Sequence, residues 1–343
     1  MKSALITGIS GQAGSYLCEL LLEKGYTVTG IVRRNSVFLH ESPRLDHITD
    51  SNLKLVYGDM TDTPSIVAAL EISNPDEIYN LASQSDVRIS FDIPTYTAQV
   101  CAMGAANLFE SARNVCPNAK IYQASTSELY GNSVDDDGFQ RETTPMVPVS
   151  PYGNSKLFAY NTAKIYRQSY GMFISNGILF NHESPRRGDN FVTNKVVDYA
   201  VRIKNGNASQ LPLGNIHSIR DWGHAAEFVQ AMWMMLQSDT PNDYVVATGV
   251  KHSVIDLVNY VFTKLDMNWQ DYVLVDKEFM RPHDVDYLCG DSSKLQKELG
   301  WKPNYTFEQI LDEMIEQRLG CLWDLQRHVL RYTDVYRYRK HRL

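Results

Sequence analysis

The chain has 343 residues, of which 43% are hydrophobic and 21% are charged, proportions that are ordinary for a globular protein with a full core. Its formal net charge is −7, which argues against a broadly basic surface for nucleic acid. The sequence has neither an apolar run of about 18 residues nor the long apolar region of a signal peptide, so we expect no membrane contact and a cytoplasmic protein.

The first half of the chain alternates short apolar runs with stretches of helical periodicity. Strands are predicted at residues 4–7, 27–32, 54–57, 77–81, 120–125 and 173–180, and helices at 12–24, 64–72, 94–115 and from about 151 onward. Strands separated by helices form right-handed βαβ units and therefore a parallel sheet. The expected fold class is α/β, with a Rossmann-type, doubly wound parallel sheet and a smaller, mostly C-terminal α/β lobe.

After about residue 182 the periodicity weakens. Helices are predicted at 190–204, 222–237, 253–265 and 307–319, and short strands at 211–213, 244–247 and 272–275. We expect a Rossmann domain over 1–182, a second lobe over 183–325 whose chain crosses back to the first, and a basic tail over 326–343. The five cysteines have no metal-ligand spacing, so we expect reduced thiols and no bound metal.

Three glycines follow the first predicted strand and open the first predicted helix. Gly8, Gly11 and Gly14 have the spacing G-x-x-G-x-x-G, a variant of the dinucleotide fingerprint. Glycines permit a tight turn and let backbone N–H groups approach a pyrophosphate, which then faces the positive end of the helix dipole. This strand–turn–helix context predicts a dinucleotide site that contains Gly8, Gly11, Gln12 and Gly14.

The residues after the second predicted strand favour NADP over NAD. NAD-binding folds usually place an acidic residue about 20 positions after the glycines, where it binds the ribose 2′-hydroxyl. This chain has no Asp or Glu between positions 23 and 41 and instead has Arg33 and Arg34, whose guanidinium groups can bind a 2′-phosphate. Asp59 and Met60 are predicted near the adenine, and Leu81 near the pyrophosphate or the nicotinamide ribose.

A tyrosine and a lysine four residues apart carry the predicted chemistry. Tyr152 and Lys156 lie on one face of a helix, about 6 Å apart along its axis. The pKa of a tyrosine hydroxyl is near 10, and a fixed ammonium together with a positive nicotinamide ring would lower it toward the working range. The Lys156 ammonium can also bind the cofactor ribose.

Two further side chains follow the fifth predicted strand, where parallel sheets place their chemistry. Thr126 could hydrogen-bond the reacting oxygen beside Tyr152. Glu128 is more informative, because a simple alcohol dehydrogenase needs only a hydroxyl, a tyrosine and a lysine. The added carboxylate predicts a second proton transfer.

Together these residues resemble the extended short-chain dehydrogenase/reductase family and, within it, the GDP-mannose 4,6-dehydratases. The resemblance runs from Leu5 to about Pro303, and its most specific stretches are residues 30–34, 124–131, 176–188, 218–224, 281–286 and 300–303. It implies that Tyr152 and Lys156 form the redox pair, that Thr126 contacts the substrate hydroxyl, and that Glu128 is the base.

The resemblance also implies a reaction and a substrate site. Tyr152 would take the proton of the sugar 4-hydroxyl as C4 gives hydride to NADP, Glu128 would remove the C5 proton, and water would leave from C6. Hydride would then return to C6 and a proton to C5. The net reaction would be a lyase step that yields a GDP-4-keto-6-deoxy sugar. The positions that match the GDP-sugar site are Asn181, Val192, Lys195, Arg220 and Arg281. The two arginines could instead pair with Asp221 or Asp284.

The sequence departs from the resembled pattern at several positions. Ala13 stands where the family usually has Asp, and Asn194 where it has Arg. Asp86 and Arg88 stand where it has His and a small or apolar residue, next to Ser85, which we expect at the substrate. These changes leave a GDP-manno-heptose substrate open as an alternative. A nucleotide-sugar reductase or epimerase on the same fold is the second alternative.

The resemblance further implies an assembly of identical chains. Family members form dimers through a four-helix bundle, and many form tetramers, so we expect a homodimer or homotetramer. The predicted helices at 94–115 and 151–170 are the candidate bundle. The segment 34–44 is a candidate for contact with the cofactor site of a neighbouring subunit.

Overall fold

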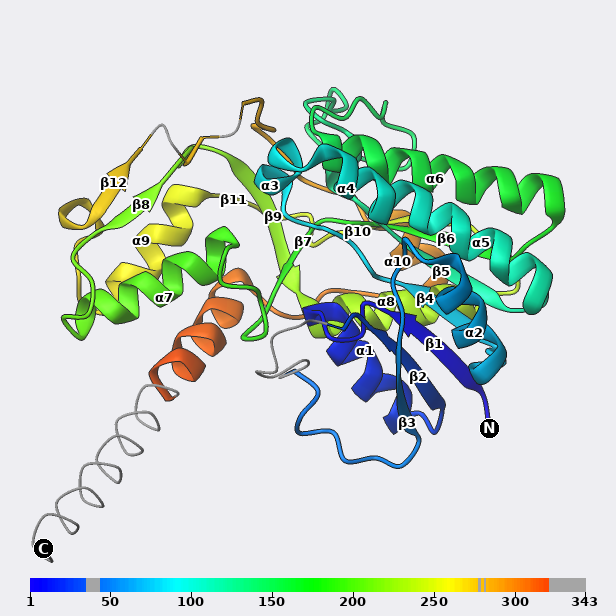
Figure 1. Ribbon diagram of the computed structural model, residues 1–343. Helices are drawn as coiled ribbons and strands as arrows, with labels where there is room; N and C mark the ends of the chain where they lie inside the picture. Colours follow the sequence, from blue (N-terminus) through cyan, green and yellow to red (C-terminus); the bar gives the residue numbers. More distant parts are fainter. Residues whose placement is uncertain (35–43, 277–278, 281, 321–343) are drawn as a thin grey trace, which may run out of the picture.

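Two parts of the chain lie side by side in the computed structural model (Figure 1). The structure describes residues 1–34, 44–276, 279–280 and 282–320. One part is built on a seven-stranded sheet, and the other combines small sheets with helices. No helix among these described residues is both long enough and apolar enough to cross a bilayer.

The larger part is a parallel sheet with the strand order β10-β6-β5-β4-β1-β2-β3. Its strands are β1 (Ser3–Thr7), β2 (Thr27–Val32), β3 (Leu53–Tyr57), β4 (Glu77–Asn80), β5 (Lys120–Thr126), β6 (Ile174–Leu179) and β10 (Asp243–Val246). The direction of winding reverses between β1 and β4, and ligands of open α/β sheets bind outside the strand ends at such a point. The predicted doubly wound α/β fold is confirmed.

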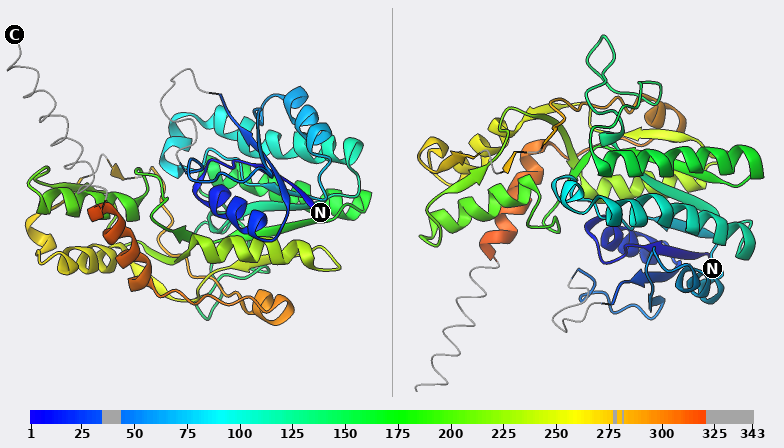
Figure 2. Two further views of the ribbon diagram at one scale, coloured as in Figure 1. Left: turned by 90° about the horizontal axis from the view of Figure 1, so that it is seen from below. Right: turned by 45° about the horizontal axis from the view of Figure 1, so that its top comes forward.

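Helices cover both faces of this sheet (Figure 2). Successive strand residues point to opposite faces, so Ala4 and Ile6 pack in one core cluster and Leu5 in another. The first cluster includes α1 (Gln12–Glu23) and α8 (Ala225–Gln237), and the second includes α2 (Thr63–Ser73), α5 (Gly104–Val115) and α6 (Pro151–Tyr170). Burial on both faces explains the continuous apolar runs that made the strands predictable.

The helix predicted over 94–115 is interrupted in the structure. It consists of α4 (Pro94–Ala98), a π-helical turn at Gln99–Met103 and then α5. At Gly104 the helix closely approaches the turn that follows β3, because a Cβ there would lie 2.7 Å from the Cβ of Met60. The short helices α3 (Val87–Asp92) and α10 (Ser293–Leu299) were not predicted.

The second part contains a three-stranded and a two-stranded sheet. The strands are β7 (Asn181–Glu183), β9 (Ile219–His224) and β11 (Lys251–Ser253) in the first, and β8 (Leu211–Leu213) and β12 (Val273–Val275) in the second. A separate core joins α7 (Val192–Lys204), α9 (Val254–Lys264) and the helix at residues 307–320.

The start of the helix predicted over 222–237 is wrong. Residues up to His224 belong to β9, which pairs with β7 and β11. The helix α8 begins at Ala225, because His224 Nδ1 accepts the N–H of Ala226 at 3.1 Å and thereby caps the first turn.

The chain returns to the large sheet after β9. The helix α8 packs on that sheet and β10 adds its last strand beside β6. Asp243 in β10 accepts hydrogen bonds from Arg167 at 2.9 Å, from Tyr160 at 3.2 Å and from Asn176 at 2.8 Å. The predicted domain boundary near residue 182 remains a prediction. Residues 225–246, which follow that boundary in the sequence, lie on the large sheet.

Candidate functional site

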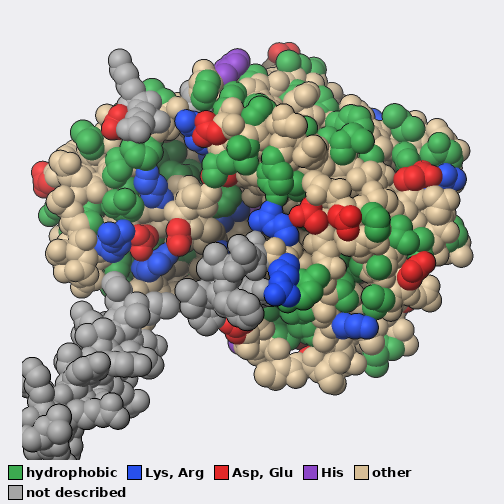
Figure 3. All heavy atoms as spheres, viewed as in Figure 1, with side chains coloured by type: hydrophobic (Ala, Val, Ile, Leu, Met, Phe, Trp, Pro, Cys, Tyr) green, Lys and Arg blue, Asp and Glu red, His purple; other side chains and the backbone are tan. Residues whose placement is uncertain are grey.

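A cleft with a volume of about 790 Å³ opens at the carboxyl ends of the parallel strands. Lys and Arg side chains gather near the middle of the face that Figure 3 shows, over the boundary between the two parts. The predicted site residues that line the cleft are Gly8, Gly11, Gln12, Gly14, Leu81, Ser85, Thr126, Glu128, Tyr152, Lys156, Asn181, Val192, Lys195 and Arg220. Arg33, Asp59 and Met60 do not line it, and Arg281 lies outside the described residues.

The glycine turn is shaped by close backbone approach. Gly8 has a φ of +70°, and a Cβ there would lie 2.8 Å from the nitrogen of Ala82. A Cβ on Gly14 would lie 2.3 Å from the oxygen of Gly8. Gly11 caps α1 without a side-chain hydrogen bond, so the N-terminal N–H groups of this helix are left for a group in the cleft.

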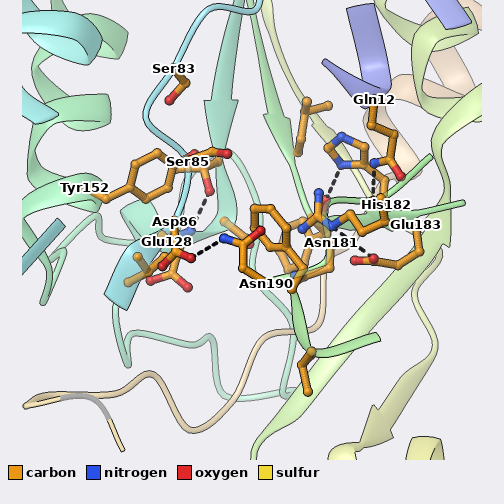
Figure 4. Close-up of a pocket in the computed structure, with 18 of the residues that line it drawn as sticks. Gln12, Ser83, Ser85, Asp86, Glu128, Tyr152, Asn181, His182, Glu183 and Asn190 are labelled. Atoms are coloured by element: carbon orange, nitrogen blue, oxygen red, sulfur yellow. Dashed lines mark hydrogen bonds and ion pairs between the residues drawn. The ribbon is translucent and has the colours of Figure 1, made fainter. Parts of the chain in front are cut away.

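Gln12 connects the glycine turn to the second part of the molecule. Its Nε2 donates to the carbonyl oxygen of His182 at 2.9 Å (Figure 4). Its Oε1 accepts from the hydroxyl of Ser184 at 2.8 Å. The side-chain amide is therefore engaged within the protein. A contribution of Gln12 to cofactor binding would come from its backbone.

The residues predicted around the adenosine end lie beside the cleft. Arg33 donates a hydrogen bond to the hydroxyl of Tyr96, and Asp59 accepts from the backbone and hydroxyl of Thr61 at 2.9 and 2.8 Å. The side chain of Met60 is buried in a core cluster with residues of α5, so a contact of Met60 with a cofactor would come from its backbone and remains a prediction. The predicted contacts of Arg33 and Asp59 with a cofactor remain predictions.

The helix α6 places Tyr152 and Lys156 at the cleft. Its N-cap is Ser150, whose hydroxyl accepts the N–H of Gly153 at 3.0 Å. Lys156 Nζ donates to the carbonyl oxygen of Ala124 in β5 at 3.0 Å and lies 5.9 Å from the centre of the Tyr152 ring. The helical spacing therefore brings both groups against the end of β5, as predicted.

Burial opposes the charged forms of this pair. It raises the pKa of Tyr152 and lowers the pKa of Lys156. A side-chain hydrogen bond with Thr126 and the positive charge of Arg187 partly offset the rise in the pKa of Tyr152, whereas the charge of Glu128 adds to it. In the protein alone, burial therefore raises the pKa of Tyr152 by more than its neighbours lower it. The sequence had led us to expect a stabilised phenolate.

Thr126 and Glu128 reach the same region from the end of β5. Thr126 Oγ1 accepts the N–H of Glu128 at 3.3 Å, which begins the 3₁₀ turn Ser127–Leu129. This turn packs closely on α6, because a Cβ on Gly153 would lie 2.8 Å from the carbonyl oxygen of Glu128. Glu128 and Tyr152 therefore lie on the same side of the cleft (Figure 4).

Two of the predicted cations, Arg220 and Lys195, line the cleft from the second part. Arg220 Nη2 lies 3.6 Å from a carboxylate oxygen of Asp284, so of the two possible ion pairs the structure contains the one with Asp284. Asp221 lies next along the strand and is directed elsewhere, accepting the N–H of Gly249 at 2.8 Å. Lys195 Nζ lies 4.1 Å from the centre of the Phe279 ring, and burial lowers its pKa.

Arg187, for which the sequence predicts no function, also lines the cleft. Its Nε lies 3.1 Å from the buried carboxylate of Glu183, and its guanidinium lies 3.7 Å from the centre of the Phe191 ring. Burial raises the pKa of Glu183 and lowers that of His182 to about 4, so His182 is neutral near pH 7. The sequence feature that could have indicated Arg187 is its position four residues after Glu183, an acidic residue at a strand end.

Comparisons with known proteins identify the family of the chain. The family model for GDP-mannose 4,6 dehydratase matches residues 5–314. The chain is 48% identical to GDP-mannose 4,6 dehydratase 1 of Arabidopsis thaliana over 93% of this chain and 90% of the relative, and 45% identical to the Homo sapiens GDP-mannose 4,6 dehydratase over 91% and 90%.

Solved structures of lower sequence identity share the fold. The dTDP-glucose 4,6-dehydratase DesIV of Streptomyces venezuelae, solved with NAD and TYD bound, is 23% identical with a TM-score of 0.80, covering 93% of this chain and 98% of its own. The UDP-glucose 4-epimerase of Thermus thermophilus, in complex with NAD, is 23% identical with a TM-score of 0.81, covering 93% and 99%.

Proposed function

The chain belongs to the GDP-mannose 4,6-dehydratase family, and we propose that it converts GDP-mannose to a GDP-4-keto-6-deoxy sugar. The observation that carries the proposal is the placement of Tyr152, Thr126 and Glu128 on one side of one cleft. A hydroxyl pair suits removal of a proton from a sugar hydroxyl, and a buried carboxylate beside it suits removal of a proton from carbon.

The glycine turn fits a dinucleotide, and we infer that the dinucleotide is NADP. The close approaches at Gly8 and Gly14 leave room for a pyrophosphate against the N-terminus of α1. Arg33 and Arg34 follow β2, and no acidic side chain occurs between positions 23 and 41 to oppose a 2′-phosphate. A bound nicotinamide supplies an acceptor and then a donor of hydride within one turnover.

The side chains divide two proton transfers, one from the 4-hydroxyl oxygen and one from C5 of the sugar. Tyr152 takes the proton of the 4-hydroxyl, while Thr126 hydrogen-bonds the same oxygen. Once C4 is a carbonyl, the C5 proton is acidified, and Glu128 removes it and passes it to the C6 hydroxyl, which leaves as water. The 4-keto-6-deoxy product then requires a proton at C5 and a hydride at C6, and a bound nicotinamide would supply the hydride. Because burial raises the pKa of Tyr152, the cations Arg187 and Lys156 are needed to favour its ionised form.

The GDP part of the substrate would lie toward the second part of the molecule. Asn181, Val192, Lys195 and Arg220 line that side of the cleft, and the matching position Arg281 completes the proposed set. Lys195 and Arg220 supply positive charge, which a pyrophosphate requires on a protein with a net charge of −7.

Incubation of the purified protein with GDP-mannose tests the reaction. We expect a product that has lost one water, with no net change in NADPH. Glu128→Gln should lower turnover by about 100- to 10,000-fold with little effect on GDP binding. Stoichiometric consumption of NADPH would indicate a reductase instead, and a Glu128→Gln protein with full turnover would argue for a reductase or an epimerase.

A charge reversal at the end of β2 tests the choice of cofactor. Arg33→Asp should weaken NADP binding by about 10- to 100-fold, because a charge-assisted hydrogen bond is worth roughly 1.5–3 kcal/mol, and should leave NAD binding nearly unchanged. Dissociation constants from the quenching of intrinsic fluorescence measure both. Equal affinities for NADP before and after the change would remove the argument for a bound 2′-phosphate.

We also infer that the chain forms at least a homodimer through α5 and α6. Met103, Phe158 and Ile165 are each about half exposed on these helices and the turn before them. Large apolar side chains gathered on one outer face mark protein contacts. Light scattering after gel filtration should show a smaller mass for Ile165→Glu but not for Ile72→Glu, a control with similar exposure on α2.

A further inference from the structure

A hydrogen bond between side chains crosses the cleft near the reacting groups. The amide nitrogen of Asn190 donates to a carboxylate oxygen of Asp86, and both residues line the cleft (Figure 4). Asp86 belongs to the first part, directly before α3, and Asn190 belongs to the loop between β7 and α7. The contact thus joins the two walls between which a substrate must lie.

Asp86 is held firmly before any substrate arrives. Its Oδ1 accepts the N–H of Ile89 at 3.0 Å and so caps α3. The side chain of Gln84 accepts the N–H of Asp86 at 2.8 Å and donates to its carbonyl oxygen at 3.0 Å. With one carboxylate oxygen and both backbone groups engaged, the other oxygen is presented to Asn190.

The loop that carries Asn190 is anchored from the opposite side. Asn194 donates to the carbonyl oxygen of Arg187 at 2.7 Å and to Asp189 at 3.0 Å, and Arg318 donates to Asp189 at 3.1 Å and to Asn194 at 3.0 Å. The loop is therefore connected to α7 and to the helix at 307–320. Asn190 is the residue of this loop that reaches across to Asp86.

On the Asp86 side, the contact lies next to residues that act on the sugar. Ser85, next to Asp86, lines the cleft together with Tyr152 and Glu128, the groups that act on the sugar ring. The proposed GDP ligands Lys195 and Arg220 belong to α7 and β9 of the second part. A hexose placed over Tyr152 and Glu128 would lie beside the Asp86–Asn190 contact.

We propose that Asp86 and Asn190 are positioning residues that close the sugar end of the cleft over the hexose. The proposal rests on the proposed function, because it places a hexose over Tyr152 and Glu128. The closure holds the sugar against the reacting groups and keeps bulk water away from them. It therefore contributes to the affinity for the sugar part of the substrate and leaves the affinity for GDP unchanged.

Substitution of Asn190 separates these two affinities. Asn190→Ala removes the contact and leaves the cap of α3 intact, so we expect GDP-mannose to bind about 10- to 100-fold more weakly, as loss of a hydrogen bond to a charged group predicts. Asn190→Asp places two carboxylates face to face and should weaken GDP-mannose binding by at least as much. The affinity for GDP, measured by isothermal titration, should change less than twofold in both variants.

A swap of the two side chains tests whether the contact itself is responsible. In the double variant Asp86→Asn/Asn190→Asp, the amide and the carboxylate exchange places, and Asn can still cap α3. We expect the double variant to recover most of the affinity for GDP-mannose that Asn190→Asp loses. Asp189→Ala, which loosens the loop without removing the contact, is the control and should retain GDP-mannose affinity within twofold.

Several results would overturn this inference. They are a parallel loss of GDP and GDP-mannose affinity in Asn190→Ala, no loss of either, a swap that fails to recover affinity, or an equal loss in Asp189→Ala. These outcomes are distinct from failure of the proposed function, which would appear in the unaltered chain as an absence of water loss from GDP-mannose.

Discussion

Gly14→Ala and Gly11→Ala test two roles of the glycine turn separately. Gly14 allows α1 to pack closely on the turn, and Gly11 allows a ligand to approach it. A Cβ on Gly14 would lie at 2.3, 2.6 and 2.7 Å from three backbone atoms of Gly8 and Ile9, so the start of α1 must move away from the turn in Gly14→Ala. A Cβ on Gly11 would meet only the oxygen of Gly8, at 3.2 Å, and the φ of −75° at Gly11 suits any residue.

The expected magnitudes follow from these distances. Gly14→Ala should lower the free energy of unfolding by about 1–3 kcal/mol, the usual cost of forcing an extra methyl into a packed site. It should also weaken cofactor binding by about 10- to 100-fold, because the N–H groups of α1 move with the helix. Gly11→Ala should change the free energy of unfolding by less than about 1 kcal/mol, yet still weaken cofactor binding, because its methyl would face the cleft.

Urea unfolding and fluorescence titration with NADP measure the two quantities on the same samples. The reasoning from backbone approach would be refuted by a Gly14→Ala protein as stable as the unaltered chain. A Gly11→Ala protein with unchanged cofactor affinity would refute the placement of the pyrophosphate against this turn.

Three further predictions concern stability. Ser150→Ala removes the cap of α6 and should lower the free energy of unfolding by about 1 kcal/mol in urea titrations. Glu183→Gln leaves the guanidinium of Arg187 without its buried carboxylate and should cost about 3 kcal/mol in the same assay, a change below about 1 kcal/mol being inconsistent with a buried ion pair. Burial raises the pKa of Asp221 to about 6 from 3.8, so the folded state binds the proton more tightly than the unfolded state. The resulting stability is present at low pH and is lost as pH rises through 6, by about 2 kcal/mol between roughly pH 4.5 and 6.5, whereas Asp221→Asn should lack this component.

Much of the fold was predictable because its signals are local. Five of the strands predicted in the first half, β1, β2, β4, β5 and β6, have both faces buried, so each reads as an apolar run that helical patterns separate, whereas the edge strand β3 is partly exposed. Tyr152 and Lys156 were predictable for the same reason, since helical spacing alone places them on one face. The glycines were predictable because the turn that they permit follows directly on a strand.

The features that were missed depend on contacts between distant residues. The π-helical turn at Gln99–Met103 precedes the close approach of Gly104 to Met60, which the periodicity of 94–115 does not reveal. The strand β9 is defined by its pairing with β7 and β11, and its residues also fit the start of a helix. The contact between Asp86 and Asn190 joins residues 104 positions apart, and neither has a local pattern that indicates the other.

The position of β10 at the edge of the large sheet has a consequence for synthesis of the chain. This strand follows β6 only after about 60 further residues, which take roughly 3–12 seconds to translate at the usual rates. Until it emerges, β6 is an unpaired edge, and Arg167 lacks the carboxylate of Asp243. A nascent chain that ends at residue 182 would therefore expose an aggregation-prone strand. Much of the second part must be synthesised before the first part can finish folding.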